Sequence, residues 1–242
     1  MLAVSGDWIC PDWPAPKQVT AFTTTRGGGV SEGPWSSFNL GNRCGDDPSH
    51  VKQNRSLLRA ALPAPVQWLQ QVHGTTVIQS TGEFKQEPEG DAMVTFEAGR
   101  VCAVLTADCL PVMFCNRSGN RVGVAHAGWR GLADGVLAAA VGAMDEDPAE
   151  LMAWLGPAIG PQAYEVGSDV AQAFAEEFPL GFTRRGDRFL MDIYALARLK
   201  LGAAGLCSVY GGGFCTLTDA DRFFSYRRDA VTGRMASVVW FE

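Results

Sequence analysis

The chain has 242 residues, of which 47% are hydrophobic and 19% are charged, so it has enough apolar side chains for a sizeable core and is not a disordered protein. Its formal net charge of -6 argues against nonspecific nucleic-acid binding, which needs a basic surface, although a few local arginines are enough to bind a small anion. We find no internal repeat or low-complexity linker. We therefore predict a single domain over residues 1–242, with a surface loop at 81–90.

The N-terminal residues lack the features of a signal peptide, because there is no basic region and Asp7 interrupts the first apolar residues. The longest apolar stretch, residues 122–144, contains His126, Arg130 and Asp134, which would be costly inside a bilayer. Seven cysteines, an odd number, fit reduced thiols that are mostly buried. We therefore expect a cytoplasmic protein with no membrane contact and no obligate protein partner.

The predicted elements begin with a strand at 19–25, rich in β-branched and aromatic residues, and a helix after Asp47-Pro48 that runs to residue 62. Short apolar runs then predict buried strands at 101–106, 112–115, 122–127 and 237–241. Further helices are predicted at 131–144, at 169–178 after a Ser168 cap and at 193–205 after an Asp192 cap. Without strict βαβ alternation, this order predicts an α+β fold of mixed sheets with helices on the outside.

Three residues that can bind a metal follow or end predicted elements. His73 lies in QQVHGTT, Cys109 follows a buried strand in LTADCLPV, and His126 ends another in VAHAGWRG. One thiolate and two imidazoles suit zinc, and three protein ligands leave a fourth position open, as in catalytic sites. The spacing itself is not a known signature, since the chain has no CxxC and no HExxH. The same residues also suit a cysteine nucleophile with a histidine base, that is, an amidase or acyl-transfer enzyme.

Several arginines lie beside glycines, which let a ligand approach the backbone, and guanidinium groups suit phosphate or carboxylate. Arg26 opens RGGGVS, Arg130 lies in GWRG, and Arg228 follows Arg227 in FFSYRRD. The loop NLGNRCGDDP places Asn39, Arg43 and Asp46 just before a helix. Turns and surface ion pairs explain these residues equally well.

Aromatic side chains that could stack on a planar base are also present, although such residues more often belong to the core. They are Trp68, Trp129, Phe223, Phe224 and Tyr226. His50, in the first turn of the helix after Asp47, is expected to be a solvated surface residue.

Seven motifs together resemble the YfiH-type family, long labelled polyphenol oxidases or laccase-domain proteins and now regarded as purine nucleoside phosphorylases with adenosine deaminase side activity. In chain order they are TTRGGGVS, FNLGNRCGDDP, LQQVHG, LTADCLPV, AHAGWRG, LGPAIGP and FFSYRRDAVTGRMAS, and the resemblance covers roughly residues 10–242. It implies one zinc ion bound by His73, Cys109 and His126, and sheets packed face to face with helices outside, in a layered α/β/β/α arrangement.

The implied reaction is phosphorolysis of adenosine, inosine or methylthioadenosine to the free base and a ribose 1-phosphate, with hydrolytic deamination of adenosine as a second activity. On this basis we expect Arg26, Arg130 and Arg228 to bind phosphate, and Asn39 and Asp46 to contact ribose or base. Asp108, next to a metal ligand, could carry a proton or could be a turn carboxylate.

The laccase label does not agree with the histidine content. A multicopper oxidase needs on the order of ten histidine ligands, and this chain has three histidines in total. A single copper in the same three-residue site is still possible in a purified sample, because copper competes well for N/S ligands. Three hypotheses follow: a zinc-dependent purine nucleoside enzyme, a Cys-His hydrolase or amidase acting for example on cell-wall precursors, and a copper-dependent phenol oxidase.

Overall fold

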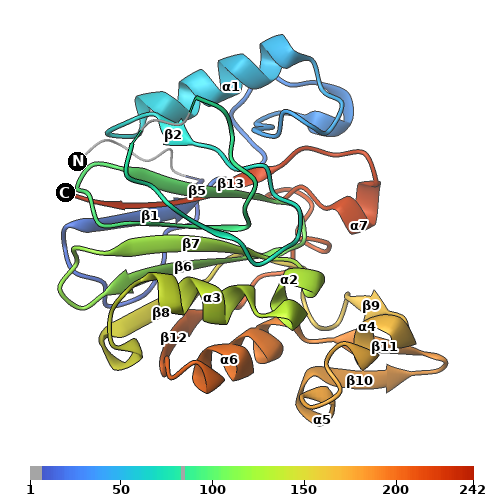
Figure 1. Ribbon diagram of the computed structural model, residues 1–242. Helices are drawn as coiled ribbons and strands as arrows, with labels where there is room; N and C mark the ends of the chain where they lie inside the picture. The colour runs from blue at the N-terminus through green and yellow to red at the C-terminus, as the bar shows by residue number, and fades with distance from the viewer. Residues whose placement is uncertain (1–6, 83–84) are drawn as a thin grey trace.

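The computed structural model describes residues 7–82 and 85–242. Two β-sheets pack face to face, and helices cover the outer face of each sheet (Figure 1). This arrangement confirms the predicted α+β fold with mixed sheets inside and helices outside. Residues 1–6 of the predicted domain and residues 83 and 84 of the predicted 81–90 loop lie outside the described residues, and the single-domain organisation stays a prediction.

The first sheet has four strands in the order β1-β13-β5-β2. Helix α1 covers its outer face, where Leu58 joins the hydrophobic cluster beneath the helix. Asp47 is the N-cap of this helix and accepts a hydrogen bond from the backbone N–H of Ser49, and Pro48 is its first residue, as the sequence predicts. The element bounds are β1 Val19–Thr23, β2 Val66–Gln67, β5 Val101–Thr106, β13 Met235–Phe241 and α1 Pro48–Ala60.

The second sheet has six strands in the order β12-β8-β6-β7-β4-β3. Its outer strand pairs, β12 with β8 and β3 with β4, are parallel, and the pairs between them are antiparallel. Helices α2, α3 and α6 cover its outer face (Figure 1). The element bounds are β3 Val77–Gln79, β4 Ala92–Thr95, β6 Leu110–Asn116, β7 Val122–Ala127, β8 Leu151–Leu155, β12 Ser208–Gly211, α2 Trp129–Asp134, α3 Val136–Ala143 and α6 Ile193–Ala203.

Alternating side chains fill the core between the two sheets. On β5, Cys102 and Val104 face the second sheet, whereas Val101 and Ala103 belong to the cluster beneath α1. Met113 of β6 lies in the same inner cluster as Cys102 and Val104. Both faces of β5 are therefore buried, which explains why its sequence is a continuous apolar run.

A third, three-stranded sheet in the order β10-β11-β9 lies to one side of the two large sheets, together with α4 and α5 (Figure 1). Asp192, the predicted cap before α6, accepts a hydrogen bond from the Ala195 N–H. The short α7 follows near the C-terminal end of the chain. The bounds are β9 Glu165–Val166, β10 Phe182–Arg185, β11 Arg188–Met191, α4 Ser168–Gln172, α5 Phe178–Gly181 and α7 Tyr226–Asp229.

Two predicted helices differ from the structure. The helix expected at 131–144 is two helices, because Gly135 adopts a left-handed φ of 100° that ends α2 and precedes α3. The helix expected at 169–178 ends at Gln172. Its N-cap is Gly167 rather than Ser168, because Ser168 is already the first residue of the helix. At Gly135, glycine allows a chain direction that the apolar pattern alone does not indicate.

All seven cysteines are free thiols, and their exposure corrects the expectation that most are buried. Cys102 and Cys115 are buried, whereas Cys10 and Cys207 are exposed. None of the helices in the described parts of the chain is long and apolar enough to span a bilayer.

Candidate metal centre

The three predicted metal ligands come from three separate segments that meet at one end of the large sheets. Cys109 lies in the turn between β5 and β6, and His126 lies on β7, which pairs with β6 so that Pro111 faces His126. His73 lies in the loop before β3 and has a left-handed φ of 62°. Because β6 and β7 are antiparallel neighbours, the turn at Cys109 comes directly beside the end of β7.

The ligand atoms of His73, Cys109 and His126 all lie within 4.8 Å of one another. The Cys109 Sγ is 3.7 Å from the His73 Nε2, and the two imidazole rings are 4.7 Å apart and nearly perpendicular, at 77°. A sulfur and a nitrogen that bind one zinc ion tetrahedrally are about 3.5 Å apart, from bond lengths of about 2.3 and 2.0 Å. The donor set and its spacing therefore fit a mononuclear metal site.

The buried carboxylate of Asp91 positions two of these ligands. Its Oδ1 is 2.8 Å from the His126 Nδ1 and accepts a hydrogen bond of 2.9 Å from the backbone N–H of His73. Its Oδ2 accepts from the backbone N–H groups of Val72 and Gly74, at 3.1 and 2.7 Å. Asp91 thus leaves the His126 Nε2 free to bind a metal, and it stabilises the left-handed turn at His73.

Two glycines of the HAGWRG motif let the His73 loop pack against α2. A Cβ on Gly128 would lie 2.5 Å from the His73 Cδ2 and 3.2 Å from the Cys109 Sγ. A Cβ on Gly131 would lie 2.8 Å from the carbonyl oxygen of Gly74. Small residues are therefore required at both positions, and the ring that packs against Gly128 is that of His73.

The electrostatics of the centre favour a charged pair. Burial opposes ionisation of the Cys109 thiol, but His126 and His73 outweigh it and lower its pKa to about 6. Burial also opposes the charge on His126, but Cys109 and Asp91 outweigh it and raise its pKa to about 9. A thiolate is the form that binds zinc, and a metal cation would displace the proton that His126 otherwise holds.

A cavity of about 530 Å³ opens above the three ligands. Arg130, predicted to bind phosphate, lines it, together with two further arginines, Arg43 and Arg234. The Arg130 guanidinium lies over the Trp129 ring at 4.3 Å, and no carboxylate of the described residues forms an ion pair with it. The cavity therefore combines three side chains that could hold a metal ion with cationic side chains that are able to bind an anion.

Arg26 and Arg228, the other predicted phosphate ligands, do not line this cavity. The Arg26 guanidinium donates to the carbonyl oxygens of Ser36 and Ala220. Arg228 donates to the carbonyl oxygens of three residues and to the carboxylate of Asp229. Both guanidinium groups connect loops around α7, so their positions favour the alternative explanation by turns and surface ion pairs.

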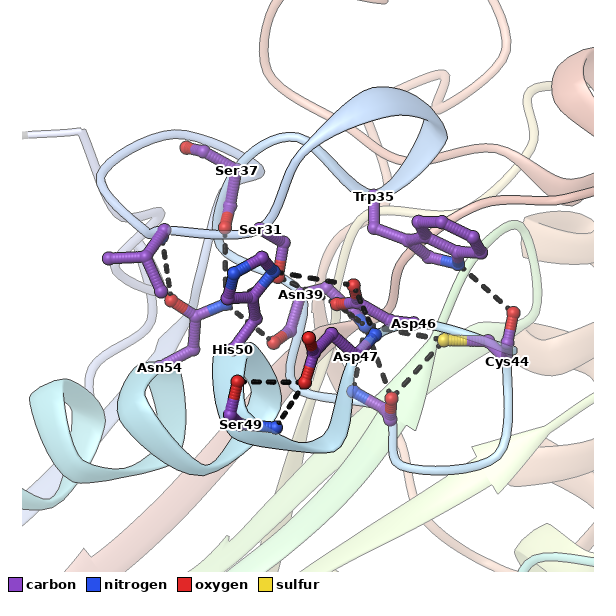
Figure 2. Close-up of polar contacts among 12 residues, drawn as sticks. Ser31, Trp35, Ser37, Asn39, Cys44, Asp46, Asp47, Ser49, His50 and Asn54 are labelled. Atoms are coloured by element: carbon purple, nitrogen blue, oxygen red, sulfur yellow. Dashed lines mark hydrogen bonds and ion pairs between the residues drawn. The ribbon is translucent and has the colours of Figure 1, made fainter.

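Asn39 and Asp46, the predicted ribose or base contacts, shape the loop that lines the cavity rather than the cavity itself (Figure 2). The Asn39 amide donates to the Asp46 carboxylate at 2.8 Å, and Ser31 donates to the same oxygen at 2.7 Å. The Trp35 indole donates to the Cys44 carbonyl at 3.0 Å. This network holds residues 41–44, all of which line the cavity. His50, expected to be solvated, is only partly exposed, with its Nδ1 3.9 Å from the Asp46 Oδ1.

Asp108, the candidate proton carrier, is nearly buried and does not line the cavity, although it precedes the ligand Cys109. Its carboxylate accepts hydrogen bonds from the hydroxyl groups of Thr216 and Ser225 and from the backbone N–H of Arg227. The structure therefore places it at the base of α7.

Two residues of the site were missed in the sequence. Asp91 follows Gly90 and directly precedes an apolar run, and a lone carboxylate at the start of a buried strand indicates a candidate site residue. Arg234 follows Gly233, which is the same arginine-beside-glycine pattern that drew attention to Arg26. Neither pattern distinguishes a site residue from a turn without the three-dimensional arrangement.

Known proteins resemble this chain over nearly its whole length. Residues 20–242 match the family model described as multi-copper polyphenol oxidoreductase laccase. The purine nucleoside phosphorylase YfiH of Escherichia coli is 52% identical, with 96% of this chain and 98% of that protein covered. The purine nucleoside phosphorylase of Pseudomonas aeruginosa is 50% identical, with 97% and 98% covered.

Solved structures agree with the fold. The Neisseria meningitidis protein NMB0706 superposes with a TM-score of 0.95 at 48% identity, covering 98% of this chain and 99% of that one. YlmD from Geobacillus stearothermophilus has a TM-score of 0.92 at 32% identity, covering 99% and 98%.

Proposed function

The chain belongs to the YfiH-type family, and on this premise we propose that it is a zinc-dependent purine nucleoside phosphorylase with a second, adenosine deaminase activity. The substrates would be adenosine, inosine or methylthioadenosine with inorganic phosphate, and the products the free base and the pentose 1-phosphate. We place it in the cytoplasm, where its free thiols stay reduced.

One observation carries this proposal: a His-Cys-His centre and three arginines face the same cavity. A zinc ion bound by His73, Cys109 and His126 would supply Lewis acidity and one open coordination position. His126 keeps its Nε2 toward the site because Asp91 occupies its Nδ1.

The arginines of the cavity provide the anion site that phosphorolysis requires. Arg130 lies in α2, immediately after the His126 strand, and its charge is not neutralised by an ion pair with a described carboxylate. Arg43 is partly neutralised by Glu87 at 3.2 Å, and Arg234 donates to two backbone carbonyls. A phosphate bound between these groups would be placed to stabilise the positive charge that develops on the ribose as the glycosidic bond breaks. We propose Arg130 as its main ligand.

A Cys-His hydrolase is the second candidate, because a thiolate at Cys109 beside the His126 imidazolium is also the arrangement of a cysteine nucleophile. It differs from the first candidate in its metal dependence: chelators would leave such an enzyme active, and alkylation of Cys109 in metal-free protein would inactivate it. A copper-dependent phenol oxidase would instead consume oxygen with a phenol and lose that activity when copper is removed. Within the described residues the His-Cys-His trio is the single group suited to a metal, too small for a multicopper cluster.

The test of the proposal is product analysis with metal-analysed protein. Adenosine is incubated with and without inorganic phosphate, and the products are separated by chromatography. We expect adenine and ribose 1-phosphate only with phosphate, and inosine without it. Cys109→Ala is expected to lose both zinc and turnover, whereas Cys207→Ala, an exposed thiol that does not line the cavity, keeps both. Zinc-loaded protein that leaves all three nucleosides unchanged would reject the purine assignment.

A further inference from the structure

The five aromatic residues that could stack on a planar base differ sharply in their surroundings. Phe223 and Phe224 are fully buried in the core. Trp68 packs under the Arg55 guanidinium and lines other hollows of the surface, and Trp129 packs against the large core with Arg130 over its ring. Tyr226 alone among the five lines the cavity above the metal ligands.

Tyr226 has the exposure and the support that a stacking surface needs. It is 59% exposed and lines the cavity, so its ring is accessible to a ligand bound there. The Arg234 guanidinium, itself fixed by hydrogen bonds to the Thr232 and Gly233 carbonyls, lies 5.9 Å from the ring centroid. The ring is therefore supported by Arg234 and still presents surface to the cavity.

We propose that Tyr226 is the residue on which the purine base stacks, and that Asp108 is a positioning residue that holds Tyr226 in place. This inference rests on the proposed function for the identity of the ligand as a purine nucleoside. It assigns two residues that line the cavity to different parts of the substrates: the base lies against Tyr226, and the phosphate lies at Arg130.

The contacts of Asp108 connect Tyr226 to the metal centre. The two residues that flank Tyr226 both donate to the Asp108 Oδ2: the Ser225 hydroxyl at 3.0 Å and the Arg227 backbone N–H at 2.6 Å. The Oδ1 accepts from the Thr216 hydroxyl at 2.6 Å. Asp108 also directly precedes the ligand Cys109, so one residue fixes the position of the stacking ring relative to the metal site.

These contacts give Asp108 a role that differs from proton transfer. All three hydrogen-bond partners of its carboxylate lie in the segment 216–227, and Asp108 does not line the cavity where the substrate would bind. Asparagine can reproduce this arrangement, because its oxygen can accept from Ser225 and Arg227 while its amide donates to the Thr216 hydroxyl. Alanine cannot. A proton carrier, by contrast, would fail equally in both variants.

The first experiment measures binding of labelled inosine, which the proposed deaminase activity does not change, by equilibrium dialysis without phosphate, beside steady-state kinetics with phosphate. Tyr226→Ala should weaken inosine binding and raise its KM by about 10- to 100-fold, the effect of losing one base-aromatic stack. The KM for phosphate and the zinc content should not change. Tyr226→Phe and Tyr226→Trp should recover most of the loss. The control is Val231→Ala, which shortens an exposed apolar side chain outside the cavity.

The second experiment compares two variants at Asp108. Asp108→Ala should raise the KM for inosine more than it lowers kcat, and Asp108→Asn should restore most of the lost affinity. Inosine binding to Tyr226→Ala equal to that of the wild type would overturn the stacking role. Equal loss of kcat in both Asp108 variants would overturn the positioning role.

The proposed function can fail separately from this inference. Wild-type protein that binds inosine but does not turn over any nucleoside would reject the phosphorylase assignment, while the dialysis comparison would still decide whether Tyr226 holds the base. Wild-type protein that does not bind inosine at all would overturn the inference as well.

Discussion

Replacing Asp91 should remove the hydrogen bonds that hold His73 and His126 in position. Its fully buried carboxylate makes four hydrogen bonds: one with the His126 ring and three with the backbone N–H groups of residues 72–74. Breaking a buried charged pair by removing one partner costs about 3–5 kcal/mol, and losing a carboxylate that orients a metal-binding histidine lowers metal affinity by about 10- to 100-fold. Asp91→Ala should therefore lose both stability and zinc affinity.

Asp91→Asn should be intermediate. Whichever way its amide is oriented, the NH₂ group faces N–H donors, so about half of the four contacts are lost. Zinc affinity is measured by competition with a chromogenic chelator, and the free energy of unfolding by urea titration of metal-free protein. Asp187→Asn, on the exposed β10–β11 turn, is the control. Zinc affinity of Asp91→Ala within twofold of the wild type would refute the reasoning.

The pH dependence of the free energy of unfolding of metal-free protein tests the same role of Asp91. Burial favours protonation of Asp91, but the His126 ring and the backbone N–H groups outweigh it and lower its pKa. A carboxylate whose pKa is lowered by folding stabilises the protein above its unfolded-state pKa, and that contribution disappears as the pH falls through the folded-state pKa. The wild type should therefore lose more unfolding free energy on acidification than Asp91→Asn does.

Three further changes test the site and the fold. Iodoacetamide should alkylate Cys109 in metal-free protein with a midpoint near pH 6, far below the midpoint in the urea-unfolded chain, and bound zinc should protect the thiol. Peptide mass spectrometry follows the reaction. A midpoint that unfolding does not change would contradict a stabilised thiolate at Cys109. Gly128→Ala places a methyl group against the His73 ring and should greatly reduce zinc content without unfolding the protein, as metal analysis and circular dichroism would report. Gly135→Ala should cost about 1–2 kcal/mol in urea unfolding, because its φ is 100°, and should leave turnover intact; no loss of stability would show that α2 and α3 do not depend on this turn.

The fold was predictable where the sequence pattern is local. Short apolar runs identified β5 and β7, and Asp47 with Pro48 identified the start of α1. One error lies at Gly135, because a glycine can continue a helix or break it, and only the packing of α2 and α3 on the sheet decides which. The short strands β2, β3 and β9 have two or three residues and depend on pairing with distant parts of the chain.

The candidate site was predictable in its ligand types and less so in its surroundings. A chain with three histidines offers few choices for an N/S metal site, so His73, Cys109 and His126 stood out. The sequence does not distinguish arginines that line the cavity from arginines that do not. Arg26 and Arg130 share the same local pattern, yet Arg26 connects two loops and Arg130 lines the cavity. What distinguishes them is the direction of a long side chain in the folded protein, which sequence spacing does not determine.

The central claim is that one metal ion at the His-Cys-His centre is required for nucleoside turnover. The most direct test removes the metal with a chelator, adds zinc back in measured equivalents, and follows phosphate-dependent release of adenine from adenosine. We predict that activity is absent in metal-free protein, rises linearly with added zinc, and saturates at about one zinc per chain, with no recovery in Cys109→Ala. Full activity in metal-free wild type, or recovery of Cys109→Ala by zinc, would contradict it.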